Sequence, residues 1–190
     1  MSARRIIVGI SGASGVVLGV RLLELLRELG LETHLVATRA AILTIGHELG
    51  RSYESVKALA SVVHGTHDVG AAIASGSFKT EGMIVAPCSM RTLAAIATGV
   101  TDTLLTRAAD VVLKERRRLV LLPRETPLHL GHLRNMVAVT EMGAIVMPPV
   151  PAFYAGSGSV EAMIDQILGR ALDLFGLDCP RVVRWQGKRA

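Results

Sequence analysis

Two short motifs of small and hydroxylated residues carry the groups in this chain that are best suited to bind an anion. Gly-Ile-Ser-Gly-Ala-Ser-Gly occupies positions 9–15, and Pro-Cys-Ser-Met-Arg-Thr-Leu occupies positions 87–93. Each motif follows an apolar run typical of a buried parallel strand and leads into a helical pattern. The carboxyl ends of parallel strands lie at one edge of a sheet, where open α/β folds bind nucleotides and anions. We therefore expect both motifs to contribute backbone N–H groups and hydroxyls to a ligand site at that edge.

The first of these motifs matches no nucleotide-binding fingerprint. Gly12-Ala13-Ser14-Gly15 lacks the G-x-G-x-x-G spacing of dinucleotide-binding turns and is not a Walker A loop. A tight turn before a helix also uses glycine for its backbone conformation alone. By itself the motif fits a ligand loop and a plain turn equally well, and it does not predict NAD or ATP.

Four charged residues outside the motifs have both functional and structural interpretations. Arg124 and Glu125 follow an expected strand, so we place them at the same sheet edge, although they could form a structural ion pair. Glu48 lies near the end of a helical pattern, where a surface residue is the ordinary interpretation. Lys114 shares a helical face with Asp110, which favours an ion pair as much as a ligand contact.

Two further polar residues lie in the last third of the chain. Tyr154 ends the proline-rich segment Pro-Pro-Val-Pro-Ala-Phe-Tyr, and glycines follow it at 156 and 158. A stiff approach followed by flexible residues is typical of a lid anchor. Arg170 lies beside the apolar stripe of the last helix, where an arginine that covers apolar surface with its stem is the alternative.

The cysteines and histidines give no prediction of nucleophilic or metal chemistry. Cys88 has no histidine next to it in the sequence to activate a thiolate, so we interpret it as a packing residue. The pairs His64–His67 and His129–His132 each leave a two-residue gap, but no cysteine pair or HExxH pattern supplies further ligands. We predict no metal site.

Composition limits the class of protein. The 190 residues fit one domain, and two cysteines fit a reduced compartment without a disulfide framework. Half of the residues are hydrophobic and only six are aromatic, which predicts an aliphatic core and additional burial in a homo-oligomer. Glycine and proline interrupt the long uncharged stretches, and no signal peptide precedes the first strand, so we expect no membrane span and a cytoplasmic location.

The net charge of +5 does not predict nucleic-acid binding, because most basic residues are scattered along the chain. The one dense run, at positions 114–118, ends a helical pattern and contains no aromatic residue that could stack on a base.

Apolar runs and helical patterns alternate along the whole chain, which predicts a parallel sheet with helices on both faces. We expect an α/β fold, a single-domain doubly wound parallel sheet of the Rossmann or flavodoxin-like three-layer type, spanning 1–190 with a C-terminal tail from about 178. The expected strands are Arg5–Ile10, Glu32–Ala37, 71–74, 82–86, 119–123 and 144–147. The expected helices cover 18–29, 39–49, 91–98, 104–117, 132–142 and 160–175.

Several segments together resemble one known family. They are Gly-Ala-Ser-Gly at 12–15, Pro-Cys-Ser-x-x-Thr-Leu at 87–93, Arg-Ala-Ala-Asp-Val-Val-Leu-Lys-Glu-Arg-Arg at 107–117, Pro-Arg-Glu-Thr-Pro at 123–127, Met-Pro-Pro-Val-Pro-Ala-Phe-Tyr at 147–154 and Arg-Trp-Gln-Gly at 184–187. In this order and spacing they resemble the flavin prenyltransferase (UbiX) family, and the resemblance runs from about residue 4 to 187.

The resemblance implies a reaction and its partners. Such enzymes hold reduced FMN and join a dimethylallyl group from dimethylallyl monophosphate to N5 and C6 of the flavin. The prenylated FMN then serves a separate decarboxylase in ubiquinone or aromatic acid metabolism. The resemblance also implies a homododecamer. Lys, Arg and Tyr donors would stabilise the departing phosphate, and the chain lacks the Asp-rich Mg²⁺ motif of diphosphate prenyl chemistry, so we expect a metal-independent reaction.

The resemblance also assigns roles to individual residues. The expected FMN contacts are Gly12, Ala13, Ser14, Thr38, Ser89, Met90, Arg91, Thr92 and Arg124. Tyr154 and Arg170 would bind the prenyl phosphate, with Lys114 and Glu48 completing that site. The expected catalytic residues are Ser14, Glu48, Lys114, Glu125 and Trp185.

Two departures from the family pattern and two alternatives remain. Thr38 stands where serine is more usual and keeps the hydroxyl, and Ala-Gly-Ser-Gly at 155–158 replaces a bulkier segment after Tyr154. A flavin-dependent decarboxylase of the cysteine-decarboxylating group shares the fold, but its Pro-x-Met-Asn-x-x-Met-Trp motif is absent here. A non-catalytic flavin carrier would not need Lys114, Tyr154 and Arg170 to converge on a second phosphate.

Overall fold

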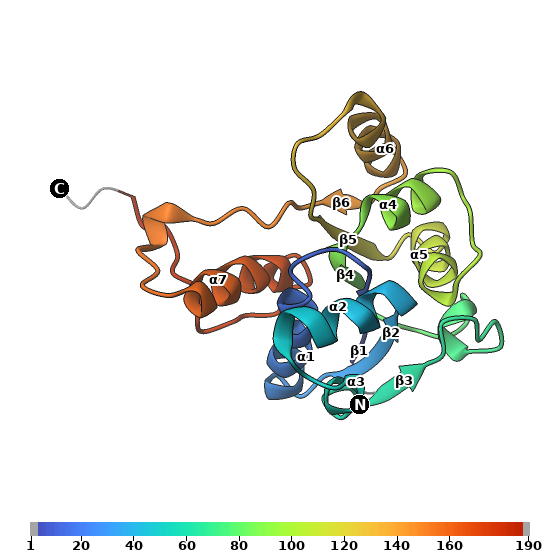
Figure 1. Cartoon of the computed structure of the whole chain (residues 1–190), viewed down its shortest axis with the longest axis horizontal. Helices are drawn as coiled ribbons and strands as arrows, with labels where there is room; N and C mark the ends of the chain where they lie inside the picture. The colour runs from blue at the N-terminus through green and yellow to red at the C-terminus, as the bar shows by residue number, and fades with distance from the viewer. Residues whose placement is uncertain (1–3, 188–190) are drawn as a thin grey trace. The chain divides into compact units, whose positions relative to one another are not determined.

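Residues 4–187 are described by a computed structural model, in which six parallel strands form one sheet in the order β3-β2-β1-β4-β5-β6 (Figure 1). The strands are β1 (Arg5–Ile10), β2 (Glu32–Ala37), β3 (Val62–His64), β4 (Gly82–Cys88), β5 (Arg118–Pro123) and β6 (Ile145–Val146). The strand order reverses between β1 and β4, which makes the carboxyl ends of these two strands the switch point of the sheet. The predicted doubly wound α/β class is confirmed.

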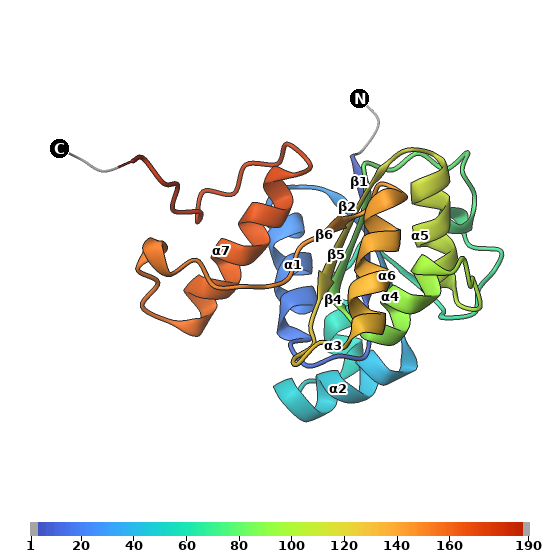
Figure 2. The same ribbon diagram turned by 90° about the horizontal axis from the view of Figure 1, so that it is seen from above.

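Helices cover both faces of the sheet. Between residues 4 and 148 the α-helices are α1 (Val17–Glu28), α2 (Arg39–Leu49), α3 (Tyr53–Lys57), α4 (Met90–Ala97), α5 (Leu104–Lys114) and α6 (Leu130–Glu141). Figure 2 shows α1 on one side of the sheet and α4, α5 and α6 on the other. The core between these layers is aliphatic, as the composition predicts, because the strands bury Ile, Val and Leu side chains on both faces.

Helix α1 forms because leucines recur on one face at helical spacing. Leu18, Leu22, Leu25 and Leu26 are all buried against the sheet. Gly19 lies on the same face, and a Cβ at this position would come within 2.4 Å of the Ala86 carbonyl oxygen. The helix therefore packs directly on the ends of β1 and β4, and this packing fixes where its N-terminus lies.

By compactness the chain divides into two units, Met1–Pro148 and Pro149–Ala190. The first contains the sheet and the helices named above. The second contains a 3₁₀ turn, η2 (Phe153–Ala155), the helix α7 (Val160–Asp173) and the C-terminal segment. No helix or strand occurs between 178 and 187, which agrees with the predicted tail, whose last residues, 188–190, lie outside the described part. That residues 1–190 form a single domain stays a prediction.

Inside the second unit, side chains of α7 hold the C-terminal segment. The Gln166 amide donates to the Val183 carbonyl at 3.0 Å, and its oxygen accepts from the Val183 N–H at 2.8 Å. A Cβ at Gly169 would meet the side chain of Val182 at 2.1 Å. These contacts keep the residues that follow, including Trp185, next to α7.

Several predicted boundaries are wrong, and each has a local cause. Residues 71–74 form no strand, because Ala72–Ala74 is a 3₁₀ turn, η1. Helix α5 ends at Lys114 instead of 117, where Arg116 takes a left-handed conformation with φ of 56° and turns the chain into β5. Helix α6 begins at Leu130 instead of 132, because the His129 ring accepts from the Gly131 N–H at 3.0 Å and caps the helix.

Two elements were not predicted at all. The short helix α3 and the edge strand β3 lie between α2 and β4, in a segment without a strong apolar pattern. Both valines of β3 are exposed, so the strand lacks the buried run by which the others were recognised. Among residues 4–187, no helix is both long and apolar enough for a membrane crossing.

We predict that Gly19→Ala destabilises the protein. The added methyl group must displace the Ala86 carbonyl or the side chain of Ile10, and overpacking of this kind costs about 1–3 kcal/mol. Thermal unfolding followed by circular dichroism should show a Tm several degrees lower. Gly46→Ala in α2 is the matched control, because nothing lies within 4 Å of its added Cβ, and it should raise the Tm slightly. Equal Tm values for Gly19→Ala and the unsubstituted protein would contradict the close packing of α1.

Candidate functional site

A cavity of about 580 Å³ opens at the carboxyl edge of the sheet. Its lining comes from the turns that follow β1, β2, β3, β4 and β5. All nine residues that the sequence assigned to the cofactor line it, namely Gly12, Ala13, Ser14, Thr38, Ser89, Met90, Arg91, Thr92 and Arg124. The structure therefore brings together residues that lie up to 112 positions apart in the sequence.

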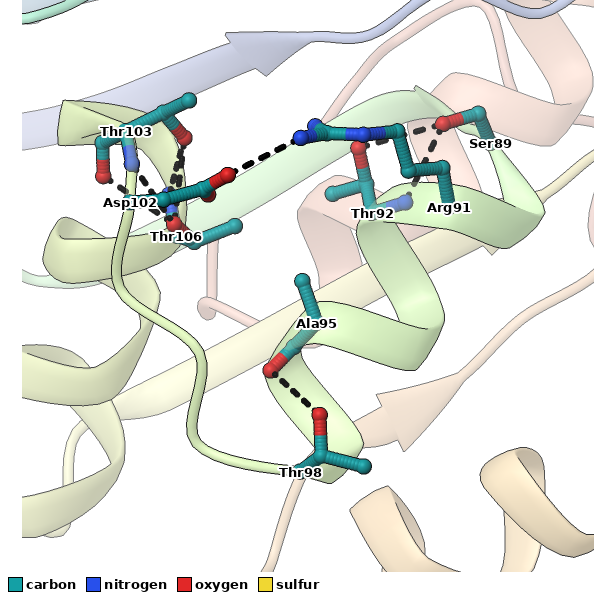
Figure 3. A network of polar contacts seen from close by, with 8 residues as sticks. All are labelled: Ser89, Arg91, Thr92, Ala95, Thr98, Asp102, Thr103 and Thr106. Atoms are coloured by element: carbon teal, nitrogen blue, oxygen red, sulfur yellow. Dashed lines mark hydrogen bonds and ion pairs between the residues drawn. The ribbon is translucent and has the colours of Figure 1, made fainter.

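Three helices begin at this cavity, and the residue that caps each one lines it. Thr38 Oγ1 accepts from the Ala41 N–H at 3.1 Å, and Ser89 Oγ accepts from the Thr92 N–H at 3.2 Å. Thr103 caps α5, where it and Thr106 form a reciprocal capping box (Figure 3). Helix N-termini carry partial positive charge, so α2, α4 and α5 together favour an anion in this cavity.

Charged side chains add to this positive field. Arg39, Arg91 and Arg124 line the cavity, against one carboxylate, that of Glu125. Arg91 Nη2 donates to Asp102 Oδ2 at 2.9 Å, which ties the first turn of α4 to the loop before α5 (Figure 3). Both side chains are substantially exposed, so we regard this ion pair as a restraint on the Arg91 orientation and not as a source of stability.

Glu48 reaches from the end of α2 to the loop after β1. Its carboxylate accepts from the Gly15 N–H at 2.9 Å and from the Val16 N–H at 3.1 Å. Burial opposes its ionisation, but hydrogen bonds from Ser14, Gly15 and Val16 and the charge of Arg124 outweigh burial and lower the pKa of Glu48. Glu48 is exposed, as the ordinary surface interpretation expects, and its carboxylate also binds the two N–H groups directly before α1 and so caps this helix.

Glu125 lies in the turn after β5, and Cys88 is the last residue of the neighbouring strand β4. Glu125 lines the cavity next to Arg124, and its carboxylate accepts from the Thr126 N–H at 3.0 Å. Cys88 is fully buried, and this burial raises the pKa of its thiol to about 12. A thiol of this kind is not a nucleophile at neutral pH, which confirms the interpretation of Cys88 as a packing residue.

The second unit has a cavity of its own, of about 340 Å³. Tyr154, Arg170 and Trp185, all predicted site residues, line it. The Tyr154 and Trp185 rings meet edge to face with centroids 5.7 Å apart. Asp173 Oδ2 accepts from Arg170 at 2.6 Å, and Asp173 also binds Arg184 through both carboxylate oxygens. The cavity thus presents two guanidinium groups and a phenol, donors that suit a phosphate.

Lys114 lies apart from the other predicted residues of the first unit. It stands at the last residue of α5, next to the amino end of β5, and forms an ion pair with Glu115. Helix α5 is capped by Thr103 at the carboxyl edge of the sheet, where the 580 Å³ cavity lies, and its eleven residues span about 15 Å to the opposite edge. Lys114 lines another cavity there, of about 540 Å³, with Asp110 and Arg116. Within one copy of this unit, Lys114 and Glu48 do not meet.

Five residues that line the 580 Å³ cavity were not predicted: Arg39, Ala40, Thr66, His67 and Thr103. Thr66 and His67 follow β3, so recognising the Val62-Val63 pair as a strand would have placed them at the same edge. The Thr103-x-x-Thr106 spacing is a capping signal that also was available in the sequence. Arg39 and Ala40 simply form the first turn after Thr38.

Three of the four histidines in the pairs His64–His67 and His129–His132 stack on another histidine ring, and the fourth, His67, lines the 580 Å³ cavity. His34 stacks on His64 with ring centroids 5.3 Å apart, and His129 stacks on His132 at 3.5 Å. In the described part of the chain, no three His, Cys, Asp or Glu side chains gather as a metal-binding group. That the reaction needs no metal stays a prediction.

Comparison with known proteins decides the family. The Flavoprotein family model matches residues 1–172. Flavin prenyltransferase UbiX of Neisseria meningitidis is 56% identical over 184 residues, which cover 97% of both chains. Flavin prenyltransferase UbiX of Escherichia coli K12 is 55% identical over 97% of this chain and 99% of the relative. This chain belongs to the UbiX family of flavin prenyltransferases.

Solved structures of UbiX proteins have the same fold. The crystal structure of AnUbiX (PadA1) in complex with FMN and dimethylallyl pyrophosphate matches with a TM-score of 0.96 at 54% identity, over 98% of this chain and 100% of that one. A dodecameric FMN-dependent Ubix-like decarboxylase from Escherichia coli O157:H7 matches with a TM-score of 0.94 at 52% identity, over 96% of this chain and 100% of that one. The predicted family and enzyme class, a UbiX flavin prenyltransferase, are confirmed.

The cysteine-decarboxylating alternative is supported by fold alone. The FMN-dependent cysteine decarboxylase SpaF is 19% identical with a TM-score of 0.62, over 76% of this chain and 83% of that one. A match at this low identity shows a shared architecture, and it gives no evidence of a shared activity. The UbiX family has the full-length match, so the cysteine-decarboxylase interpretation is set aside.

We predict that Glu48→Gln destabilises this UbiX protein at neutral pH by about 0.5–1 kcal/mol, because an amide makes weaker hydrogen bonds to Gly15 and Val16 in a solvent-exposed site. The folded-state pKa of Glu48 lies below its unfolded value, so this stabilisation is present above the unfolded pKa and is lost as the pH falls through the folded one. The difference in Tm between the two proteins should therefore be largest near pH 7 and shrink below about pH 4.

Glu141→Gln, at the exposed last residue of α6, is the control for Glu48→Gln and should show no such pH-dependent difference. If the Tm difference for Glu48→Gln stays constant from pH 7 to pH 3, the carboxylate does not cap α1.

Proposed function

We propose that this chain binds reduced FMN in the 580 Å³ cavity and transfers a dimethylallyl group from dimethylallyl monophosphate to N5 and C6 of the flavin. The product is prenylated FMN. The main support is that all nine flavin residues expected from the family pattern line one cavity at the switch point of the sheet. The relative whose structure contains FMN and a dimethylallyl compound has the same fold over nearly the whole chain.

The cavity fits FMN in charge and size. Its volume lies in the range of small-ligand sites, and the N-termini of α2, α4 and α5 favour a phosphate. Arg39, Arg91 and Arg124 supply positive charge at the cavity wall, where Glu125 is the one carboxylate in the lining and Asp102 pairs with Arg91 from outside it. A bound reduced flavin supplies the nucleophilic nitrogen and carbon of the reaction. The chain has to hold the flavin and keep N5 and C6 accessible.

Tyr154 and Arg170 are the proposed ligands of the prenyl phosphate. Breaking an allylic C–O bond leaves negative charge on the phosphate, and donors that bind the leaving oxygen atoms lower the barrier. The Arg170 guanidinium can form charge-assisted hydrogen bonds to those oxygens, and the Tyr154 hydroxyl can donate one more. Trp185 packs edge to face on Tyr154 and offers apolar surface to a prenyl chain.

Glu48, Ser14 and Glu125 are the proposed proton-handling residues. Closing a ring at C6 requires removal of a proton from that carbon, so a base has to lie near the flavin. The hydrogen bond between Glu48 and Ser14 provides a route for a proton, and the lowered pKa of Glu48 makes its carboxylate a weak base that passes a proton on and does not retain it. Glu125 supplies a second carboxylate at the cavity wall.

Lys114 would serve a flavin site of another copy of the chain. If it acts together with Glu48, as the family pattern implies, the two residues have to come from different subunits, because α5 separates them within one. A homododecamer such as the Escherichia coli O157:H7 relative forms provides neighbouring copies. We propose the same assembly for this protein.

We further propose that the product leaves for a prenylated-FMN-dependent decarboxylase in ubiquinone or aromatic acid metabolism. A cytoplasmic location is also proposed, because the two cysteines, Cys88 and Cys179, are buried and free.

The proposed activity predicts a definite product. Protein, FMN reduced with dithionite and dimethylallyl monophosphate, incubated without oxygen, should give a flavin heavier by one dimethylallyl unit in mass spectrometry. FAD in place of FMN should give little product, because the cavity has no dinucleotide fingerprint. Recovery of unmodified FMN at full occupancy of both ligands would refute the proposed transfer and leave flavin carriage as the function.

The proposed role of Lys114 predicts complementation between inactive variants. Lys114→Ala and Glu48→Ala should each abolish most turnover when expressed alone. Co-expressed in equal amounts, they should form mixed oligomers in which about a quarter of the sites have both residues intact. Activity restored to that fraction supports a shared site. If mixed oligomers stay as inactive as the separate variants, both residues act within one copy or Lys114 acts elsewhere.

A further inference from the structure

Ser11 is a fully buried polar residue that belongs to none of the predicted site roles. It directly follows β1 and directly precedes the Gly12-Ala13-Ser14 turn. Its hydroxyl donates to the Pro87 carbonyl at 2.9 Å and accepts from the Ser89 N–H at 2.7 Å. One side chain thus satisfies two backbone groups, one at the end of β4 and one in the turn that follows it.

This bridge lies where the backbone ladder between β1 and β4 stops. The last paired residues of the two strands are Gly9 and Val85. Beyond them Pro87 has no N–H to donate, so regular pairing cannot continue along β4. The Ser11 N–H still reaches the Pro87 carbonyl at 3.2 Å. Beyond that point the two hydrogen bonds of the Ser11 hydroxyl connect the ends of β1 and β4.

The bridge continues into the N-terminus of α4. Ser89, whose N–H binds Ser11, caps α4 with its own hydroxyl, which accepts from the Thr92 N–H and donates to Thr92 Oγ1 at 3.1 Å (Figure 3). Thr92 itself is 2% exposed. A line of hydrogen bonds therefore runs from the end of β1 through Ser11 and Ser89 to the first turn of α4.

Both ends of this line are walls of the same cavity. Gly12, Ala13 and Ser14 follow Ser11 on one side, and Ser89 to Thr92 stand on the other. Ser11 does not line the cavity and so touches no ligand in it. Its effect on a ligand has to pass through the spacing of these two turns.

We propose that Ser11 is a positioning residue for flavin binding, whose hydroxyl fixes the distance and orientation between the turn after β1 and the N-terminus of α4. Without the hydroxyl, the part-buried Ser89 N–H loses its acceptor, and the turn has to shift to find another. Such a shift misaligns donors on both walls at once. The proposal rests on FMN being the ligand of this cavity.

The test compares Ser11→Ala with Thr33→Ala. Thr33 is a matched control because it is 1% exposed and its hydroxyl also accepts a backbone N–H from another segment, that of Ser61 at 3.0 Å, but at the amino side of the sheet. Both variants should lower the Tm by similar amounts. Only Ser11→Ala should raise the Kd for FMN, roughly tenfold, measured by quenching of flavin fluorescence.

Steady-state turnover adds a second measurement. Ser11→Ala should raise the KM for FMN while keeping most of kcat at saturating FMN, because no group that touches the reacting atoms is removed. If Ser11→Ala does not fold, Ser11→Cys replaces it, since a thiol keeps the shape of the side chain and accepts hydrogen bonds only weakly. An unchanged Kd for the Ser11 variant, or an equal rise for Thr33→Ala, overturns the proposal.

Hydrogen exchange without any ligand separates this proposal from the proposed function. In Ser11→Ala the amides of Ser89 and Thr92 should exchange faster than in the unsubstituted protein, and in Thr33→Ala they should not. If the unsubstituted protein fails to bind FMN but this exchange pattern is seen, the proposed ligand is wrong and the positioning role stands. If exchange at 89–92 is the same in all three proteins, the positioning role is wrong whatever the ligand.

Discussion

Parallel pairing of all six strands is the constraint on which the rest of this structure depends. Parallel strands need a long crossover connection, usually a helix, so the turns that lead from β1, β2, β4 and β5 into helices all fall on the same edge. Residues as distant in sequence as Gly12 and Arg124 become neighbours for this reason alone. The strands themselves bury mostly apolar side chains on both faces, and the buried polar residues of β2, Thr33 and His34, do not line the cavity. Binding is therefore confined to the turns and to the first residues of the helices.

Close backbone packing turns this edge into a defined site. A Cβ at Gly12 would lie 2.3 Å from the Cβ of Ala40, so the turn after β1 rests directly on the first turn of α2. Gly19 brings α1 equally close to the ends of the central strands. With the walls this near to one another, single hydrogen bonds such as those of Ser11 and Glu48 are sufficient to set the spacing between turns. The hydrogen bonds of Ser11 and Glu48 and the close packing at Gly12 and Gly19 therefore all determine the spacing between the turns at this edge.

The sequence was sufficient for the central strands and for bringing the nine residues of the family pattern to one cavity, because both leave local signals. Buried apolar runs identify β1, β2, β4 and β5, and the turns at their ends then follow from topology. Edge strand β3 has exposed valines and leaves no such signal, so Thr66 and His67 were missed with it. The position of Lys114 was beyond sequence reasoning for a different reason. Helical periodicity tells which face a residue occupies, but not which copy of the chain that face meets.

The capping of α1 by Glu48 has a consequence for the range of nucleotides that this fold can accept. In dinucleotide-binding relatives of the architecture, the first helix offers its N-terminal N–H groups to a pyrophosphate. Here those of Gly15 and Val16 are already bound to a carboxylate from the chain itself. A pyrophosphate approaching this helix would meet a fixed negative charge in place of free donors. The Glu48 carboxylate thus occupies, from within the chain, two donors next to α1 that a pyrophosphate would otherwise find free.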